Sequence, residues 1–339
     1  MANISMKRNE VLSLISEKAG YKSGISINYN CMIKYFDQRD KEIFGGDKES
    51  FIRFRPEEYE QAFFNVLYGV GYLRVEKPSP HAFEFLHKYK NDAEKFETFQ
   101  NILQMRNEWM KEEVDRNIAN GGKSLDPTTF IDKSERVYGN IGLQMCREVL
   151  MGIIEYGNAS PWSDFRRIEW HDSIELKQLF ESEALEASYG TFIDQRYIDY
   201  LYRNFDDIDG MHWRKFEALT CEYFSKEGYY VEIGKGRNDE GVDARIWPKM
   251  DDKEAPPTML IQCKRQKDKI SKTIVKALWA DVTYEKAESG LIVTSTAISP
   301  GAKKTMIARG YNVTYAERDT LRQWIKKMRT PFEGYFLGE

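Results

Sequence analysis

The sequence predicts an α/β protein: a mostly helical α+β N-terminal domain, followed by a C-terminal domain with a central mixed sheet flanked by helices. The chain has 339 residues, more than a single compact core usually holds. Apolar residues follow helical spacing through most of residues 1–205, whereas helix-like and strand-like patterns alternate after the acidic segment FDDIDG at 205–210. We therefore expect two domains, residues 1–205 and residues 206–339.

The overall composition is that of a soluble globular protein, with 41% hydrophobic and 31% charged residues. There is no apolar run of the roughly 18 residues that a membrane span needs, and the N-terminus lacks the apolar segment of a secretory signal. The cysteines are scattered and form no CxxC pair: Cys31, Cys146, Cys221 and Cys263. This pattern argues against a structural zinc site or a disulfide framework and predicts a cytoplasmic protein.

Helical patterns dominate the N-terminal domain. We expect helices at 5–18, 57–73, about 81–118, 134–156, near 173–186 and 191–204. The alternating segment GISINYNCMIKYF (24–36) predicts a strand, and SFIRFRP (50–56) predicts a second strand that pairs with it. The aromatic residues of this domain lie at helical spacing, so we expect them in its core rather than in a ligand site.

In the C-terminal domain the expected order is α-β-β-β-α-β-α-β-α. The helix MHWRKFEALTCEYFSKEG has one apolar face and ends at Gly228. The later elements are expected at 229–234, 242–247, 258–264, 271–287, 290–296, 299–310, 311–316 and 317–329. Ser299 and Pro300 supply an N-cap and a first-turn proline for the helix that they begin. This order predicts a mixed sheet whose first three strands form a meander.

Charged and polar residues interrupt two of these strands. Strand residues alternate between faces, so Gln262 and Lys264 of LIQCK project together, and Asp243 of VDARIW projects opposite its apolar neighbours Val242, Ala244 and Ile246. If the two strands are neighbours, Asp243 comes close to Gln262 and Lys264. Glu217 lies on the preceding helix, at the edge of its apolar stripe. The pattern predicts that two carboxylates, an amide and an ammonium group converge at one end of the sheet.

Such a group of side chains suits a hard divalent cation. Carboxylate and amide oxygens prefer Mg²⁺ or Mn²⁺ to zinc, and such an ion lowers the pKa of a bound water and stabilises charge on a phosphate. A nearby lysine can hold the attacking water. No serine or cysteine has an obvious histidine partner, and the histidines are dispersed at His81, His87, His171 and His212. The residues therefore indicate phosphodiester hydrolysis.

Each of these residues also has an ordinary structural explanation. Asp243 is explained as a loop-end cap or an ion-pair partner of Arg245, and Gln262 as the partner of a backbone group. Lys264 is explained as an edge-strand charge that prevents aggregation, and Glu217 as a solvated helix residue. The hydrolytic site is favoured because three of the four fall on projecting positions of neighbouring strands.

Positive charge is concentrated beside these strands. The net charge of the chain is −4, yet residues 206–339 carry 23 Lys and Arg against 21 Asp and Glu, a net charge of +2. Within 262–276 only Asp268 opposes six cations: Lys264, Arg265, Lys267, Lys269, Lys272 and Lys276. Of these we expect Arg265, Lys267, Lys269 and Lys272 to contact nucleic-acid phosphates, although a solvated loop and helix start would show the same pattern.

Residues 211–325 resemble the catalytic domain of Mrr-type restriction endonucleases, within the PD-(D/E)XK nuclease superfamily. The similar segments are FEALTCEYFSKEGYYVEIG, NDEGVDARI, LIQCKR and GLIVTSTAISPGAKKTMIARGYNVTYAERDTL. The resemblance implies a restriction-endonuclease-like αβββαβ core and Mg²⁺-dependent DNA cleavage. It places Asp243 at the position of the motif's metal-binding aspartate, Gln262 at that of its Asp or Glu, and Lys264 at that of its lysine. Glu217 matches the helix glutamate, and the backbone carbonyl of Cys263 would be a further metal ligand.

The implied function is a metal-dependent endonuclease for double-stranded DNA, acting in defensive restriction of foreign or modified DNA, with Mg²⁺ or Mn²⁺ as cofactor and no membrane partner. A neutral amide binds a divalent ion more weakly than a carboxylate, so we expect Glu217 or the DNA phosphate to supply the missing charge.

Residues 1–205 would select the target, by analogy with such enzymes. Double-strand cutting with one site per chain predicts a homodimer or a larger homo-oligomer. The alternatives are a structure-selective nuclease, a non-cleaving DNA-binding module with a nuclease fold, and RNA as the substrate.

Overall fold

The computed structural model describes residues 3–73, 76, 78, 87–121, 125–166, 168, 170–236 and 241–329. They divide into two compact units, each assembled from separate stretches of the chain. The first unit comprises Met1–Ser5, Arg53–Asn65 and Val75–Glu169. The second comprises Met6–Ile52, Val66–Arg74 and Trp170–Glu339, and it holds all of the predicted site residues.

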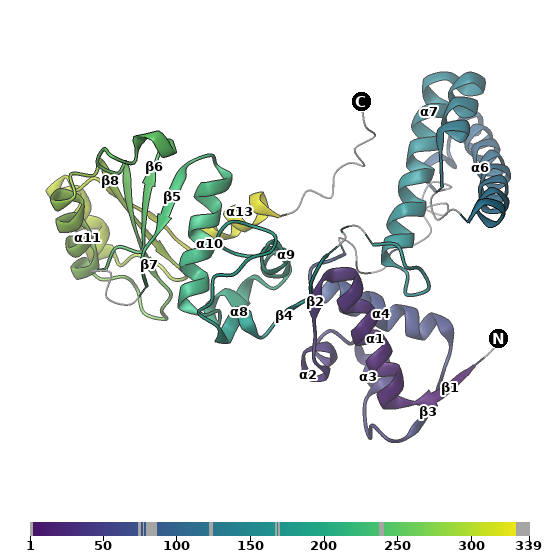
Figure 1. The fold of residues 1–339 in the computed structure, drawn as a ribbon, viewed down its shortest axis with the longest axis horizontal. Coiled ribbons are helices and arrows are strands. Elements are labelled where there is room, and N and C mark those ends of the chain that lie inside the picture. The colour runs from purple at the N-terminus through teal and green to yellow at the C-terminus, as the bar shows by residue number, and fades with distance from the viewer. Residues whose placement is uncertain are drawn as a thin grey trace. The chain divides into compact units, whose positions relative to one another are not determined.

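Two long helices form the body of the first unit (Figure 1). They are α6 (Ala93–Asn120) and α7 (Thr128–Ala159), and α4 (Pro56–Gly69) begins in this unit as well. The side chain of Asp92 caps α6, and Gly121 ends it in the left-handed conformation. A buried cluster that includes Phe99, Trp109 and Phe130 joins the two helices, which confirms the expectation that aromatic residues form the core here.

The N-terminal segments up to Phe54 depart from the expected strands. The elements are β1 (Ile4–Lys7), α1 (Arg8–Ser23), β2 (Ile25–Ser26), α2 (Tyr29–Ile33), α3 (Gln38–Phe44) and β3 (Phe51–Phe54). The predicted strand at 24–36 is wrong beyond Ser26, because the side chain of Asn28 caps α2 by accepting a hydrogen bond from the N–H of Cys31. The strand at 50–56 is confirmed by β3, but it pairs with β1 rather than with 24–36.

The segment before the nuclease-like part of the chain is less helical than expected. It contains β4 (Ile174–Glu175), α8 (Gln178–Glu181), α9 (Gln195–Arg203) and the 3₁₀ helix η1 (Phe205–Asp209). The predicted helix at 173–186 is therefore wrong except for one turn, and β4 pairs in parallel with β2. The helix at 191–204 is confirmed by α9.

A buried arginine holds these segments together. The Arg196 guanidinium donates to the Asp194 carboxylate at 2.7 Å, to the Gly24 carbonyl at 3.1 Å and to the Asp172 carbonyl at 3.0 Å, and it lies over the Trp170 ring. Its charge is paired and its donors are satisfied, as a buried arginine requires. The compact unit thus includes residues before the expected boundary at 206, and the division of roles at that boundary stays a prediction.

A five-stranded mixed sheet in the order β5-β6-β7-β8-β9 forms the centre of the second unit. The strands are β5 (Tyr230–Ile233), β6 (Ala244–Trp247), β7 (Met259–Lys264), β8 (Ser289–Thr294) and β9 (Val313–Ala316). The first three strands are antiparallel, and β7, β8 and β9 are parallel to one another. The predicted meander, mixed sheet and fold class are confirmed.

Helices cover both faces of this sheet (Figure 1). They are α10 (Trp213–Lys226), α11 (Lys272–Tyr284), α12 (Pro300–Arg309) and α13 (Arg318–Met328), and the short 3₁₀ helix η2 (Met250–Asp252) lies between β6 and β7. On the α11 face, Leu260 and Ile292 of the sheet pack with Val275 and Leu278 of α11. Ser299 caps α12 as predicted, with its hydroxyl accepting from the Ala302 N–H at 3.2 Å.

Candidate active site

The strand pair β6–β7 is irregular where the predicted site begins. Ala244 pairs with Ile261 in the ladder, yet the N–H of Asp243 donates to the carbonyl of the same Ile261 at 2.8 Å. Two successive residues of one strand thus face one residue of the other, which is the arrangement of a β-bulge. The prediction that Val242 and Ala244 share a face is therefore wrong: Val242 packs with Leu260, whereas Ala244 faces Ile261 on the opposite side of β7.

The bulge brings Asp243 and Gln262 to the same end of the strand pair. Both side chains are buried, with 6% of each exposed. The Asp243 Oδ2 atom accepts from the N–H of Cys263 at 2.6 Å, and the Gln262 Nε2 atom donates to the Gly241 carbonyl at 2.9 Å. Gly241 has a φ of +92°, and a Cβ there would lie 3.1 Å from Gln262 Nε2, so this position requires glycine. The side chain at 262 thus holds the backbone two residues before Asp243.

The Oε1 atom of the Gln262 amide has an unusual environment. Among the residues that the structure describes, its Oε1 atom is buried without a hydrogen-bond partner. Buried acceptors are normally satisfied, and an exception calls for a ligand, an ion or a water. An amide oxygen near a carboxylate suits a hard divalent cation, so the donor set fits Mg²⁺ or Mn²⁺. The described residues contain no group of three or more His, Cys, Asp and Glu placed to hold a metal, so any ion here would depend on amide, backbone and water oxygens as well.

Glu217 is buried on α10, with 5% exposed, and it is paired with a residue that the sequence reasoning missed. Its Oε2 atom accepts from the Arg214 Nη1 at 2.7 Å, and the Nη2 of Arg214 donates to the Gly234 carbonyl at 2.6 Å. The N–H of Gly234 donates in turn to the Asp243 carbonyl at 2.8 Å. Arg214 therefore connects the helix carboxylate to the backbone at Asp243. The signal available in the sequence was an arginine three residues before the glutamate on one helix.

Two buried thiols, Cys221 and Cys263, lie near both carboxylates. Burial raises the pKa of Cys263 well above its usual value, and the Asp243 and Glu217 carboxylates raise it further. Burial likewise raises the pKa of Cys221 on α10, with Glu217 and then Asp243 adding to the effect. Both carboxylates are therefore close enough to the two thiols to raise their pKa, whereas the convergence of Glu217 and Asp243 in one site stays a prediction. A role for the Cys263 carbonyl as a ligand stays a prediction.

Lys264 ends β7 beside this group. Its carbonyl accepts from the Thr294 hydroxyl at 2.7 Å, which fixes the backbone between two parallel strands. The side chain is partly exposed, and within the described part of the chain its Nζ has no hydrogen-bond or ion-pair partner. The ammonium group is thus available to a ligand at the end of the strand.

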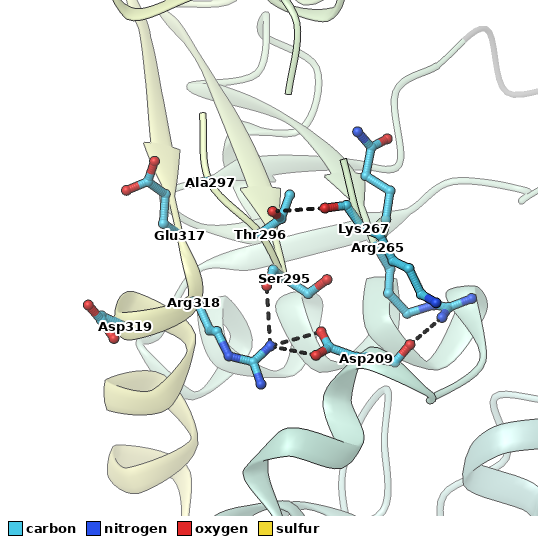
Figure 2. Close-up of a pocket in the computed structure, with 10 residues that line it drawn as sticks. Asp209, Arg265, Lys267, Ser295, Thr296, Ala297, Glu317, Arg318 and Asp319 are labelled. Carbon is cyan, nitrogen blue, oxygen red and sulfur yellow. Dashed lines mark hydrogen bonds and ion pairs between the residues drawn. The ribbon is translucent and has the colours of Figure 1, made fainter. Parts of the chain in front are cut away.

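The predicted phosphate-contacting residues separate into two groups. Lys269 and Lys272 are exposed at the start of α11. Arg265 and Lys267 line a pocket of about 600 Å³ at the carboxyl ends of β7, β8 and β9 (Figure 2). This pocket also contains Arg318, which the sequence reasoning did not single out.

The second unit thus combines an αβββαβ core with an aspartate, a Gln-x-Lys element and a helix glutamate, as the resemblance to PD-(D/E)XK nucleases implies. Residues 208–325 match the family model Mrr_cat, described as a restriction endonuclease, which confirms the resemblance predicted for 211–325. This part of the chain is therefore similar in sequence to a restriction endonuclease domain.

Among solved structures, the chain is similar to the MspJI restriction endonuclease in complex with a 27-mer oligonucleotide, with 19% sequence identity and a TM-score of 0.28. The match covers 56% of this chain and 41% of that chain, so the chain spans less than half the length of that protein. No match was found among curated proteins. In the described residues, no helix combines the length and the apolar character needed to cross a bilayer.

Proposed function

We propose that this protein is a metal-dependent endonuclease that hydrolyses phosphodiester bonds of double-stranded DNA at the Asp243–Gln262–Lys264 site. The observation that carries the proposal is the buried Oε1 of Gln262, which has no hydrogen-bond partner among the described residues and lies at the same strand end as Asp243. The next projecting residue of that strand is Lys264, whose Nζ also lacks a partner in the described part of the chain. The restriction endonuclease family match over 208–325 supports the same reaction class.

The chain's own residues supply binding and positioning. Asp243, the Gln262 amide oxygen and the Cys263 carbonyl would hold Mg²⁺ or Mn²⁺, with Glu217 as a further carboxylate. The bound ion would lower the pKa of water and stabilise charge on the phosphate. Lys264 would donate a hydrogen bond to the attacking water and share charge with a phosphate oxygen. The water oxygen forms the new P–O bond while the bridging P–O bond breaks, which leaves a phosphate monoester and a hydroxyl group.

The biological role follows as part of the same proposal. An endonuclease of this class would act in defensive restriction of foreign or modified DNA, with residues 1–205 choosing the target. Two strands need two cuts, so a chain with one site would act as a dimer or larger assembly.

A plasmid-nicking assay tests the activity. Wild-type protein is mixed with supercoiled DNA in Mg²⁺, in Mn²⁺ and in EDTA, beside Lys264→Ala, Asp243→Asn and the matched control Lys304→Ala, an exposed lysine on α12. We expect metal-dependent nicking by the wild type and the control, and a loss of at least about 100-fold in both site variants. Equal nicking by wild type and Lys264→Ala would sink the proposal.

Two further outcomes would replace it with another function. Salt-sensitive binding that persists in EDTA, with no cutting under any condition, would indicate a non-cleaving DNA-binding module. Faster cutting of branched DNA than of linear duplex would indicate a structure-selective nuclease, and preferential cutting of RNA would change the substrate class.

A further inference from the structure

We propose that the pocket at the carboxyl ends of β7, β8 and β9 is a second phosphate-binding site for the DNA strand, formed by Arg318, Arg265 and Lys267, and that the carboxylates of η1 occupy it in this structure. The inference rests on the proposed function and extends it to residues away from the hydrolytic group. It assigns a role to Arg318, which lies outside the basic segment 262–276.

The position of the pocket suits a ligand that also reaches Lys264. Three parallel strands end at this edge, and open α/β sheets bind ligands outside the carboxyl ends of their strands. Arg265 directly follows Lys264, and the loop after β8 contributes Ser295 and Thr296 to the wall of the pocket (Figure 2). A polymer whose phosphate lies at Lys264 would therefore pass close to this pocket.

Arg318 already binds anions in a forked geometry. Its Nη1 donates to both carboxylate oxygens of Asp209 at 2.8 Å, and its Nη2 donates to Asp206 Oδ1 at 2.8 Å (Figure 2 shows the Asp209 contacts). The fork of an arginine matches carboxylate and phosphate alike. The side chains of Asp206 and Asp209 are 88% and 56% exposed, so water screens these ion pairs and a phosphate can replace them.

Arg265 retains unused donors. Its Nη1 donates to the Asp209 carbonyl at 2.6 Å, whereas its Nε is buried with no partner in the described residues. Asp209 contacts both Arg265 and Arg318, and Asp206 contacts Arg318 as well, so displacement of η1 would remove its contacts to both guanidinium groups. The Arg318 Nη1 would keep its hydrogen bond to the Ser295 carbonyl at 3.3 Å. Lys267 is exposed at the rim.

The remaining carboxylates of the pocket do not cancel this charge. Glu317 accepts from the Ile298 N–H at 2.7 Å and pairs with Lys303 at 2.9 Å, so it is already compensated. Asp319 is exposed on the first turn of α13. Once η1 moves aside, Arg265, Lys267 and Arg318 face one uncompensated carboxylate, which leaves a net positive pocket.

Equilibrium DNA binding tests the inference. Full-length protein is titrated into fluorescein-labelled duplex in EDTA, which prevents metal-dependent cutting, across a series of salt concentrations. Arg318→Gln should weaken binding about tenfold and reduce the slope of log K against log salt by about 1, the value for one lost phosphate contact. The double variant Asp206→Asn with Asp209→Asn should instead bind more tightly, by about threefold or more, because the competing anions are gone.

The two variants are expected to change DNA affinity in opposite directions, which distinguishes phosphate binding from a purely structural role of these residues. Both variants break the ion pairs of Arg318 with Asp206 and Asp209, and the double variant also removes the longer Arg322–Asp206 pair at 4.0 Å. If these pairs only stabilised the fold, both variants would weaken binding. Arg309→Gln is the matched control, since it removes one positive charge from the end of α12, beside the amino ends of the strands, and should change neither affinity nor slope. Circular dichroism melting verifies that each variant is folded.

Unchanged affinity and slope for Arg318→Gln, or weaker binding by the double aspartate variant, would overturn the inference. If the wild type still nicks plasmid in that case, the proposed function stands and only the pocket assignment fails. If the wild type neither binds nor cuts DNA, the proposed function itself fails.

Discussion

Changing Gln262 to glutamate probes the site most directly, because it alters one group and leaves the shape of the side chain almost unchanged. The amide donates to the Gly241 carbonyl at 2.9 Å, and a carboxylate has no hydrogen to donate there. A lost hydrogen bond costs about 1 kcal/mol, and a second buried carboxylate close to Asp243 adds to this. We expect the metal-free variant to be about 1–3 kcal/mol less stable than the wild type, which lowers the melting temperature by about 2–4 °C for each kcal/mol.

Bound Mg²⁺ or Mn²⁺ should restore the stability that the Gln262→Glu variant loses. The new carboxylate puts a charged ligand where the amide oxygen has no partner among the described residues, and a tenfold gain in affinity for Mg²⁺ returns about 1.4 kcal/mol at saturating metal. The assay is thermal unfolding in EDTA and across a titration of Mg²⁺ or Mn²⁺. Gln262→Glu should gain more from metal than the wild type does.

Gln266→Glu is the matched control for this experiment. Its Nε2 also donates to a backbone carbonyl, that of Asp268 at 2.8 Å, but this hydrogen bond is exposed. It should change stability by less than about 0.5 kcal/mol and show no altered metal response. The reasoning is refuted if Gln262→Glu is as stable as the wild type in EDTA, or if metal shifts both melting temperatures equally.

Other substitutions and pH test the surrounding structure. Arg214→Gln removes the cation that pairs with the helix carboxylate, so nicking should slow by about tenfold or more and its acid limb should move to higher pH; an unchanged pH–rate profile would contradict the assignment. Arg196→Met leaves Asp194 buried without its partner and should cost about 3–5 kcal/mol in urea unfolding, whereas a change below 1 kcal/mol would show that the pair is dispensable. Burial raises the pKa of the Cys221 and Cys263 thiols, so the folded state keeps their protons when the unfolded state loses them near pH 8.5. The free energy of unfolding should therefore fall above pH 8.5, by up to about 1.4 kcal/mol per pH unit for each thiol, and replacing both by alanine should flatten that fall.

The sequence predicts the C-terminal domain well because its periodicities are unambiguous. Apolar residues form a continuous run in β8 and are interrupted by single charged residues in β5 and β6, and the helix that begins at Ser299 carries both a cap and a first-turn proline. The N-terminal half offers weaker signals. The segment 24–36 alternates like a strand, but a single asparagine, Asn28, begins a helix within it, and local capping outweighs the alternation.

The structure tests the geometry that the sequence predicts for the site, whereas the roles of the site residues stay predictions. Alternation identifies the projecting residues of a regular strand, and it holds for β7, where Leu260 packs under α11 and Ile261 pairs with Ala244. It fails at Asp243, because a bulge adds one residue to β6 and side-chain direction then depends on hydrogen bonds across the strands. Arg214 was missed because only one of its two acceptors, Glu217, lies on the same helix; the other, the Gly234 carbonyl after β5, cannot be inferred from the helical pattern.

The geometry also gives a reason for an amide at position 262, where the resemblance leads one to expect a carboxylate. The side chain of Gln262 needs both a hydrogen-bond donor and an acceptor. Its Nε2 donates to the Gly241 carbonyl and so holds the loop that leads into the bulge, and its Oε1 would serve as the acceptor for a ligand. A carboxylate supplies only the acceptor, whereas an amide supplies both without needing an ion to neutralise it. The negative charge that a divalent ion requires is then left to Asp243, to the Glu217 carboxylate across from it and to the phosphate of the substrate. A site built in this way would bind its metal weakly until DNA arrives, so the metal affinity of the wild type should rise when a DNA duplex is bound, and the gain should be smaller in Gln262→Glu, which carries its own charge.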